Sequence, residues 1–298
     1  MITKELLVYD LRKLGVQEGD ILNVKMSYKS IGKVEGGINT VVDALLEAVG
    51  TEGTIVSDSF VLGHLPFKMW LSPQKCLVDQ NTPSYAGALA NVLIKHPFAK
   101  RSPHPIQKFV AIGKHADIVL EHNADSAPYS TLHTMAKMGA KNIRIGGIDK
   151  VVGVGTTHVA YDLLGWKQRN YRSVVSYIEN GKVKNFKHFW PSACATAVNN
   201  LIPLYREFGG IVSEGKVGEA EAMLTDFQKT LHIELTIGKQ FPYFVKCQDP
   251  ACQVCRLQWP DSDGNVIKVI YQNLKRRKFK AIAKVLWWWI AKRETGRA

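Results

Sequence analysis

Two side chains that could transfer a proton lie four residues apart in the segment Gly155–Gly165. We expect Thr156 to cap a short helix here and Gly165 to end it. His158 would then lie in the first turn, where the helix dipole disfavours a second positive charge and keeps the imidazole neutral near pH 7. Asp162 would share the same helix face. Such a pair suits a general base and its orienting carboxylate. The alternative is a histidine that caps or packs the helix without chemistry.

A second stretch with chemical interest joins the predicted strand 21–24 to the predicted helix 38–49. Backbone N–H groups at a helix start form an anion site together with the helix dipole, and glycines allow a ligand to approach closely. The spacing fits neither a Walker P-loop nor a dinucleotide fingerprint, and the alternative is an ordinary turn. The candidate anion-binding residues are Lys25, Ser27, Lys29, Ser30, Gly36 and Gly37.

Two further groups of polar residues are candidates for a site. The prolines in Arg101-Ser-Pro-His-Pro105 predict a rigid turn that gathers Arg101, Ser102 and His104, which we expect to contact the cofactor. The alternative is a proline turn with polar groups at the surface. The irregular segment 61–82 could line or cover a site. Asp58 and Asp79 are among the few acidic residues in or beside these stretches, and we expect them to contact a substrate.

The elements that must position these residues have an α/β pattern. The predicted strand 21–24, helix 38–49 and strand 53–60 form a β–loop–α–β unit. No internal repeat or low-complexity linker divides the chain. Other predicted elements are a helix over 3–14 capped by Thr3, a hairpin of 174–177 and 182–189 turning at Asn180-Gly181, a helix over 193–208, a helix starting within 215–224 and a helix over 227–238.

The amino-acid composition limits the classes of protein to which the chain can belong. The chain has 298 residues, of which 46% are hydrophobic and 22% charged, so it can bury a core. The formal net charge is +13, and eight Lys and Arg residues with no acid lie in Lys275–Arg293. The body is therefore mildly basic and the tail strongly so, which suits an anionic partner. The first residues lack a signal-peptide pattern, and no apolar run approaches the roughly 20 residues that span a bilayer. We expect a cytoplasmic protein.

Taken together, the ordered motifs resemble the aminoglycoside 3-N-acetyltransferase family of CoA-dependent acyltransferases. Each motif is short, but their order and separation make the set fairly specific, and the resemblance covers roughly residues 3–245. In chain order the motifs are Met26-Ser-Tyr-Lys-Ser-Ile-Gly32, Val34-Glu-Gly-Gly37, Gly53-Thr-Ile55, Arg101-Ser-Pro-His-Pro105, Ser126-Ala-Pro128, Gly155-Thr-Thr-His158 and Val217-Gly-Glu-Ala220.

The resemblance implies an α/β/α sandwich with a mixed central sheet and an acyl-CoA donor, acetyl or longer. It implies that the serine-rich loop holds CoA and that His158 is the general base. This chain departs from the family pattern at two positions: Tyr161 stands where the family has a glutamate, and Lys25 where it has a histidine. Either Tyr161 or Asp162 is then expected to replace the missing carboxylate.

Three cysteines lie beyond the clear resemblance, in Cys247-x4-Cys252-x2-Cys255. This spacing suggests a structural zinc site whose fourth ligand is missing locally, and His232 or Cys194 could supply it. The alternative is three free or buried thiols. In a reducing compartment neither interpretation involves disulfides.

The basic tail over 273–298 predicts an amphipathic helix with three adjacent tryptophans, Trp287 to Trp289. Such a helix suits a membrane surface, here peripheral to the inner face of the membrane. Docking on the domain or on a dimer partner is the alternative, and a homo-oligomer is left open. The predicted organisation is an acyltransferase domain over 1–246, a Cys-containing extension over 247–272 and this helix.

The acceptor is inferred from charge alone. Aminoglycosides are polycations whose sites are expected to be acidic, whereas this chain is basic. We therefore predict a nucleotide-linked amino sugar, used for surface polysaccharide, as the acceptor amine. The alternatives are an aminoglycoside, in antibiotic resistance, and a non-catalytic relative that binds membrane through its tail. No nucleic-acid partner is expected.

Overall fold

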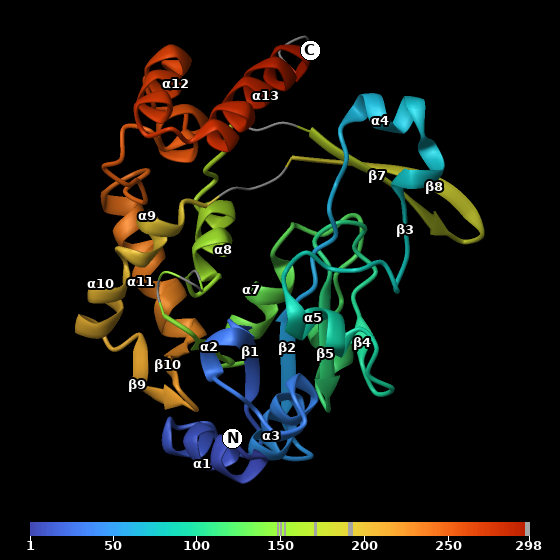
Figure 1. The fold of residues 1–298 in the computed structure, drawn as a ribbon, viewed down its shortest axis with the longest axis vertical. Helices are drawn as coiled ribbons and strands as arrows, with labels where there is room; N and C mark the ends of the chain where they lie inside the picture. Colours follow the sequence, from blue (N-terminus) through green and yellow to red (C-terminus); the bar gives the residue numbers. More distant parts are fainter. Residues whose placement is uncertain (148, 150, 152, 170–171, 190–192, 296–298) are drawn as a thin grey trace.

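The computed structural model describes residues 1–147, 149, 151, 153–169, 172–189 and 193–295. Within these residues, a mixed sheet of seven strands forms the centre of the molecule (Figure 1). The strands β1, β2 and β6 are parallel, and β5 and β10 pair antiparallel with β2 and β6. The edge strands β4 and β9 pair antiparallel with β5 and β10. In spatial order the strands are β4 (Lys100–Arg101), β5 (Phe109–Gly113), β2 (Thr54–Asp58), β1 (Ile21–Met26), β6 (Lys141–Ile145), β10 (Ala220–Asp226) and β9 (Ile211–Val217).

Helices cover both faces of this sheet, so the predicted α/β/α sandwich is confirmed. One apolar core lies between the sheet and α1 (Lys4–Lys13), α3 (Ile38–Val49) and α5 (Ala88–Leu93). A second core lies on the opposite face, under the helices that will carry the site. These are α6 (Ala116–Val119), α7 (Ser130–Lys137), α8 (Thr156–Leu163), α9 (Ala195–Asn199), α10 (Ile202–Glu207) and α11 (Phe227–Gln240).

A small second sheet lies beside the sandwich, at the upper right of Figure 1. The predicted hairpin forms it, with β7 (Arg172–Glu179) and β8 (Lys182–Phe189) joined by Asn180 and Gly181, whose φ angles are 51° and 72°. Two successive positive φ angles are what a two-residue hairpin turn requires. The predicted irregular segment supplies the third strand, β3 (Leu77–Val78), after α4 (Pro66–Leu71) and η1 (Pro73–Cys76).

The predicted helix starting within residues 215–224 is wrong, because this segment forms the β9–β10 hairpin. Gly218 makes the turn with a φ of 59°, and a Cβ there would lie 2.7 Å from the carbonyl oxygen of Ile31. Alanine and glutamate favour a helix locally, but pairing of β10 with β6 outweighs that preference. The predicted helix 193–208 is likewise two helices, since Pro203 in the first turn of α10 starts a new one.

The Cys-containing extension belongs to the same core as the rest of the sandwich. Cys247, Cys255 and Trp259 are buried in the cluster that contains the apolar residues of α8 and α11. The proposed boundary after residue 246 therefore marks no break in packing. The proposed boundary at 273 falls inside α12 (Val266–Lys275).

The tail is a pair of helices rather than one. Arg277, with a φ of 53°, separates α12 from α13 (Phe279–Thr295). Val285 and Trp288 are buried against Leu257 and Val269, and the indole Nε1 of Trp288 donates to the carbonyl oxygen of Arg169 at 3.0 Å. The tail therefore docks on the domain, as one of the two alternatives predicted.

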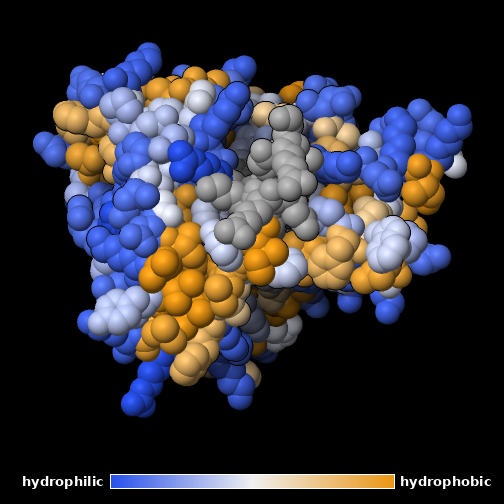
Figure 2. Space-filling model, turned by 90° about the horizontal axis from the view of Figure 1, so that it is seen from above, coloured by the Kyte–Doolittle hydropathy of each residue, from blue (hydrophilic) through white to orange (hydrophobic). Residues whose placement is uncertain are grey.

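The outer side of these helices keeps apolar side chains in contact with solvent. Figure 2 shows the molecule from this side, with apolar residues exposed among hydrophilic ones. The large apolar residues exposed on α12 and α13 include Ile267, Tyr271, Leu274, Phe279, Leu286 and Ile290. No helix within the described residues is long and apolar enough to cross a bilayer. Binding to a membrane surface stays a prediction.

Candidate active site

A cavity of about 570 Å³ lies at the carboxyl ends of the parallel strands β1 and β2, beside the first turn of α8. This edge is where open α/β sheets commonly bind ligands, because the strands end there and the following loops diverge. Lys25 of β1, Asp58 of β2 and His158 of α8 line the cavity together. Tertiary folding thus brings together three of the predicted site residues that are far apart in the sequence.

Lys25 and Asp58 form an ion pair in the wall of the cavity. The Lys25 Nζ lies 2.7 Å from Asp58 Oδ2, and the two side chains are 17% and 16% exposed. The second carboxylate oxygen, Asp58 Oδ1, is buried and accepts no hydrogen bond from the described residues. A buried carboxylate oxygen without a donor is a costly feature unless a ligand supplies one. The substrate contact predicted for Asp58 stays a prediction, and its free oxygen is the atom that could make it.

His158 is neutral at physiological pH, for a reason the sequence did not predict. Burial, and then the positive charge of Lys25, lower the pKa of His158 to about 3. Its ring stacks on the ring of Tyr129, with centroids 4.2 Å apart and an interplanar angle of 3°. Gly155 rather than Thr156 is the N-cap of α8, with a φ of 96°. The stacked ring is thus held in one orientation at the wall of the cavity.

Neither predicted partner orients His158 through a hydrogen bond within the described residues. His158 Nδ1 is buried and unpaired there. The Asp162 side chain is exposed, and its charge acts on His133 instead. Tyr161 is only 5% exposed and packs edge-on against Trp259, with centroids 4.9 Å apart. Burial raises the pKa of Tyr161, so its phenol stays neutral. The ring contacts of His158 are instead the stacking on Tyr129 and an edge-on contact with Tyr161, whose ring centroid lies 5.9 Å away. The orienting role of Asp162 is therefore not supported, whereas that of Tyr161 stays a prediction.

A buried carboxylate that the sequence analysis missed lies directly beneath this helix turn. Glu234 of α11 is 1% exposed, and its Oε1 accepts from the hydroxyl of Thr157 at 2.7 Å and from the hydroxyl of Tyr205. Burial raises the pKa of Glu234 to about 7 in spite of these hydrogen bonds. The sequence did indicate this position, because Glu234 lies at helical spacing from Phe227 and Leu231. It therefore lies on the apolar face of the predicted helix, which packs against the core.

Replacing Glu234 by glutamine is expected to change stability in a pH-dependent way. The pKa of Glu234 in the folded chain, about 7, lies above the ordinary 4.5, so the folded state holds its proton longer. Wild-type stability from this group is therefore present below pH 4.5 and is lost as the pH rises through 7. At pH 8 this difference in pKa lowers the free energy of unfolding of the wild type by up to about 3 kcal/mol.

Urea unfolding of both proteins at pH 5 and pH 8 measures this effect. We expect Glu234→Gln to gain stability relative to the wild type between pH 5 and pH 8. The exposed Glu207, replaced in the same way, is the control and should show no such gain. An equal difference between Glu234→Gln and the wild type at both pH values would contradict the prediction.

The predicted anion-binding loop has the backbone geometry that was expected of it. Gly36 and Gly37 have φ angles of 72° and 76° and lead directly into α3, and a Cβ on Gly36 would lie 2.4 Å from Thr40 Oγ1. Ser30 Oγ donates to Ser27 Oγ at 2.8 Å across the short helix α2 (Tyr28–Ile31), and Lys29 is exposed. Of the predicted loop residues, Lys25 alone is among those that line the cavity. CoA binding by this loop stays a prediction.

The motif Arg101-Ser-Pro-His-Pro105 has a structural role, which corrects its expected contact with cofactor. Arg101 donates to the carbonyl oxygens of Gln80, Thr82 and Ser59. Ser102 Oγ accepts from the amide of Phe109, and His104 Nδ1 accepts from two following amides. Ser102 and His104 are fully buried, so a cofactor has no access to them.

Asp79 also lies outside the cavity wall. Its Oδ1 accepts from the amide of Asn81 at 2.9 Å and from the hydroxyl of Thr82 at 2.8 Å, and the side chain is exposed. An aspartate that accepts from the amide two residues later stabilises its own turn. The contact with substrate predicted for Asp79 is therefore not supported, whereas Asp58 remains a candidate.

Comparisons with known proteins identify the family and the fold of this chain. The family model described as aminoglycoside 3-N-acetyltransferase matches residues 24–236. An aminoglycoside N(3)-acetyltransferase III from Salmonella sp. is 29% identical over 267 residues, covering 79% of this chain and 91% of that protein. The structure of aminoglycoside acetyltransferase AAC(3)-IIb superimposes with a TM-score of 0.70 at 26% identity, over 81% of this chain and 98% of that one.

A further similar structure contains a ligand. AAC-IIIb in a binary complex with CoASH has a TM-score of 0.69, and the match covers 81% of this chain and 98% of that chain. At 21% identity this similarity establishes the fold alone.

Proposed function

The chain belongs to the aminoglycoside 3-N-acetyltransferase family, and we propose on that premise that it transfers an acetyl group from acetyl-CoA to an amine of an aminoglycoside. The observation that carries the proposal is that one cavity is lined both by the neutral His158 and by Asp58, whose Oδ1 accepts no hydrogen bond from the described residues. An aminoglycoside presents several ammonium groups, and Asp58 can accept a hydrogen bond from one of them while His158 deprotonates another.

The acceptor first predicted, a nucleotide-linked amino sugar, is the weaker candidate. That prediction rested on the net charge of +13, but the positive excess is concentrated in the tail. In the wall of the cavity the positive charge of Lys25 is matched by the negative charge of Asp58. Relatives that align over most of their length are named for the aminoglycoside reaction, which favours the alternative acceptor.

The proposed reaction needs a base only when the amine attacks. The acceptor ammonium first loses one proton to solvent, which frees the lone pair of its nitrogen. His158 accepts a second proton from this amine as the nitrogen attacks the thioester carbonyl of acetyl-CoA, giving a tetrahedral oxyanion. A low pKa makes His158 a weak base in the empty cavity. The imidazolium becomes favourable beside the developing oxyanion, because opposite charges in a partly buried site attract strongly. Collapse of the intermediate releases the amide and the thiolate of CoA.

The oxyanion requires N–H donors at the same edge of the cavity. The first turn of α8 has amides without helical partners and carries the positive end of the helix dipole, and Thr157 of this turn lines the cavity. Thr157 is held by its hydrogen bond to Glu234. We assign the oxyanion to this turn, because preorganised donors lower the barrier of acyl transfer most effectively.

An acetylation assay tests the proposal. Purified full-length protein is mixed with acetyl-CoA and either an aminoglycoside or a nucleotide-linked amino sugar, and the acetylated product is detected by mass spectrometry. Direct detection is preferable to a thiol reagent, because the protein itself has five free cysteines. We expect acetylation of the aminoglycoside. Acetylation of the nucleotide-linked sugar alone would overturn the acceptor, and failure to bind acetyl-CoA would favour the non-catalytic alternative.

A further inference from the structure

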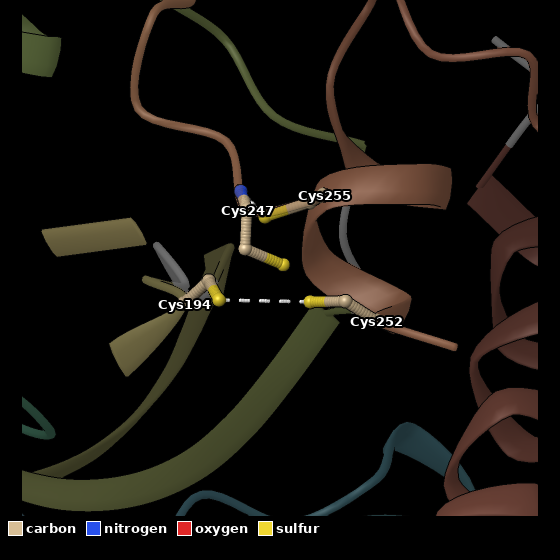
Figure 3. Close-up of side chains that lie close together, drawn as sticks. All are labelled: Cys194, Cys247, Cys252 and Cys255. Carbon is tan, nitrogen blue, oxygen red and sulfur yellow. Dashed lines mark hydrogen bonds between the residues drawn. The ribbon is translucent and has the colours of Figure 1, made fainter. Parts of the chain in front are cut away.

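The three cysteines of the extension meet a fourth cysteine that is more than fifty residues away in the sequence. The Sγ atoms of Cys194, Cys247, Cys252 and Cys255 all lie within 4.8 Å of one another. Figure 3 shows the four side chains converging from three segments: the residue before α9, the chain after α11, and the turn that contains Cys252 and Cys255. Of the two fourth ligands considered from the sequence, Cys194 is the one that folding supplies, because His232 is exposed on α11.

The spacing of the sulfurs is that of a metal site rather than of a disulfide. A tetrahedral ion with Zn–S bonds of about 2.3 Å places its sulfurs about 3.8 Å apart. The observed separation of Cys252 Sγ and Cys194 Sγ is 3.6 Å. A disulfide would require about 2.0 Å, and all four cysteines are free thiols in the structure. Four convergent sulfurs leave room for one ion, but not for the several iron and sulfide atoms of a cluster.

The backbone around the sulfurs is held in place by its own hydrogen bonds. The amide of Cys247 donates to Cys255 Sγ at 3.3 Å, a contact that stabilises a thiolate. Arg256 donates to the carbonyl oxygens of Cys247 and Asp249, and Asp249 Oδ1 accepts from the amide of Ala251 at 2.8 Å. The side chains that bind the metal are thus presented by a preformed turn, as ordered metal sites require.

We propose that Cys194, Cys247, Cys252 and Cys255 bind a structural Zn²⁺ ion. Four thiolates are the ligand set of closed structural zinc sites, in which no position is left for water or substrate. The ion would therefore take no part in acetyl transfer. Its role is to link the segment before α9 to the extension, two parts of the chain that are more than fifty residues apart in the sequence.

The position of the site connects it to the active-site cavity. Ala193 and Ala195 flank Cys194, Val254 precedes Cys255, and all three residues line the cavity that contains His158. Zinc would thus fix this part of the cavity wall without contacting substrate. Loss of the ion is expected to loosen this wall and to lower stability, since metal binding contributes directly to folding free energy.

Elemental analysis of the full-length protein, purified under reducing conditions without added metal, tests the proposal. We expect about one zinc per chain. Removing it with a thiol-reactive mercurial and a chelator should lower the melting temperature by about 5 °C or more. Reconstitution of the metal-free protein with Co²⁺ should give the intense sulfur-to-cobalt charge-transfer band and visible absorption of a tetrahedral thiolate site.

Variants assign the ligands. Cys194→Ser and Cys252→Ser should each lose most of the zinc, whereas Cys76→Ser, which alters a buried cysteine of η1 outside the cluster, should retain it. If a ligand variant fails to fold, the metal content and cobalt spectrum of the wild type still decide the matter. Absence of metal, one iron per chain in place of zinc, retention of zinc by both variants, or a disulfide within the cluster under reducing conditions would each overturn the proposal.

Discussion

Replacing His158 by alanine is expected to lower kcat by about 10²- to 10⁴-fold while leaving the affinity for acetyl-CoA nearly unchanged. The imidazole is neutral, lies at the wall of the cavity and is held by stacking on Tyr129, so it can accept a proton at the moment of attack. Alanine removes the base but leaves the β1–β2 edge and the loop before α3 intact. Steady-state kinetics and calorimetric titration with acetyl-CoA measure the two quantities.

His133 of α7 supplies the matched control for this variant. It is a histidine on a neighbouring helix that does not line the cavity, and its alanine variant should keep kcat. If His158→Ala unfolds, His158→Asn keeps a polar side chain of similar size and tests the same point. Turnover within a few-fold of the wild type in a folded His158 variant would assign this residue to packing rather than catalysis.

Replacing Asp58 by asparagine is expected to raise KM for the aminoglycoside by about 10- to 100-fold, with a smaller change in KM for acetyl-CoA. The carboxylate has one oxygen paired with Lys25 and one buried oxygen without a donor from the described residues. Asparagine keeps the shape but removes the charge that attracts an ammonium. Acetylation rates measured over a range of acceptor concentrations give the two KM values.

Asp79→Asn is the control for the acceptor prediction. Both aspartates were candidates from sequence, but Asp79 is exposed and stabilises its own turn outside the cavity. Its variant should leave both KM values unchanged. The Asp58 variant leaves Lys25 without its partner, so its melting temperature must be measured as well. Equal KM values for wild type and a folded Asp58→Asn would remove Asp58 from the acceptor site.

Local sequence patterns were sufficient for most of the sandwich. The helix α3 has the predicted bounds, and Thr3 caps α1 as expected, because apolar spacing and end signals are properties of neighbouring residues. The β9–β10 hairpin could not be predicted in this way. Its residues favour a helix locally, and only pairing with β6 makes them strands.

The candidate site also depends partly on local sequence and partly on contacts between distant segments. The sequence determined which residue types were available: a histidine at a helix start, a lysine just after one predicted strand, an aspartate within another, and closely spaced cysteines. The sequence could not show that Asp58 lines the cavity while Asp79 does not. It also could not show that Arg101 and His104 form hydrogen bonds with the backbone, because burial and hydrogen-bond partners depend on distant segments. The pKa of His158 likewise depends on burial by distant segments and then on Lys25, which lies on β1.

The cysteines show most clearly what the sequence alone could not decide. The spacing of Cys247, Cys252 and Cys255 suggested three sulfur ligands, since residues so close in the chain can meet through local turns. The choice between Cys194 and His232 was undecided, because each is remote in sequence from the other three. Only the tertiary structure decided it, by packing the start of α9 against the extension and leaving His232 on the exposed face of α11. The local order of residues determines which side chains are available, and packing between remote segments determines which of them come into contact.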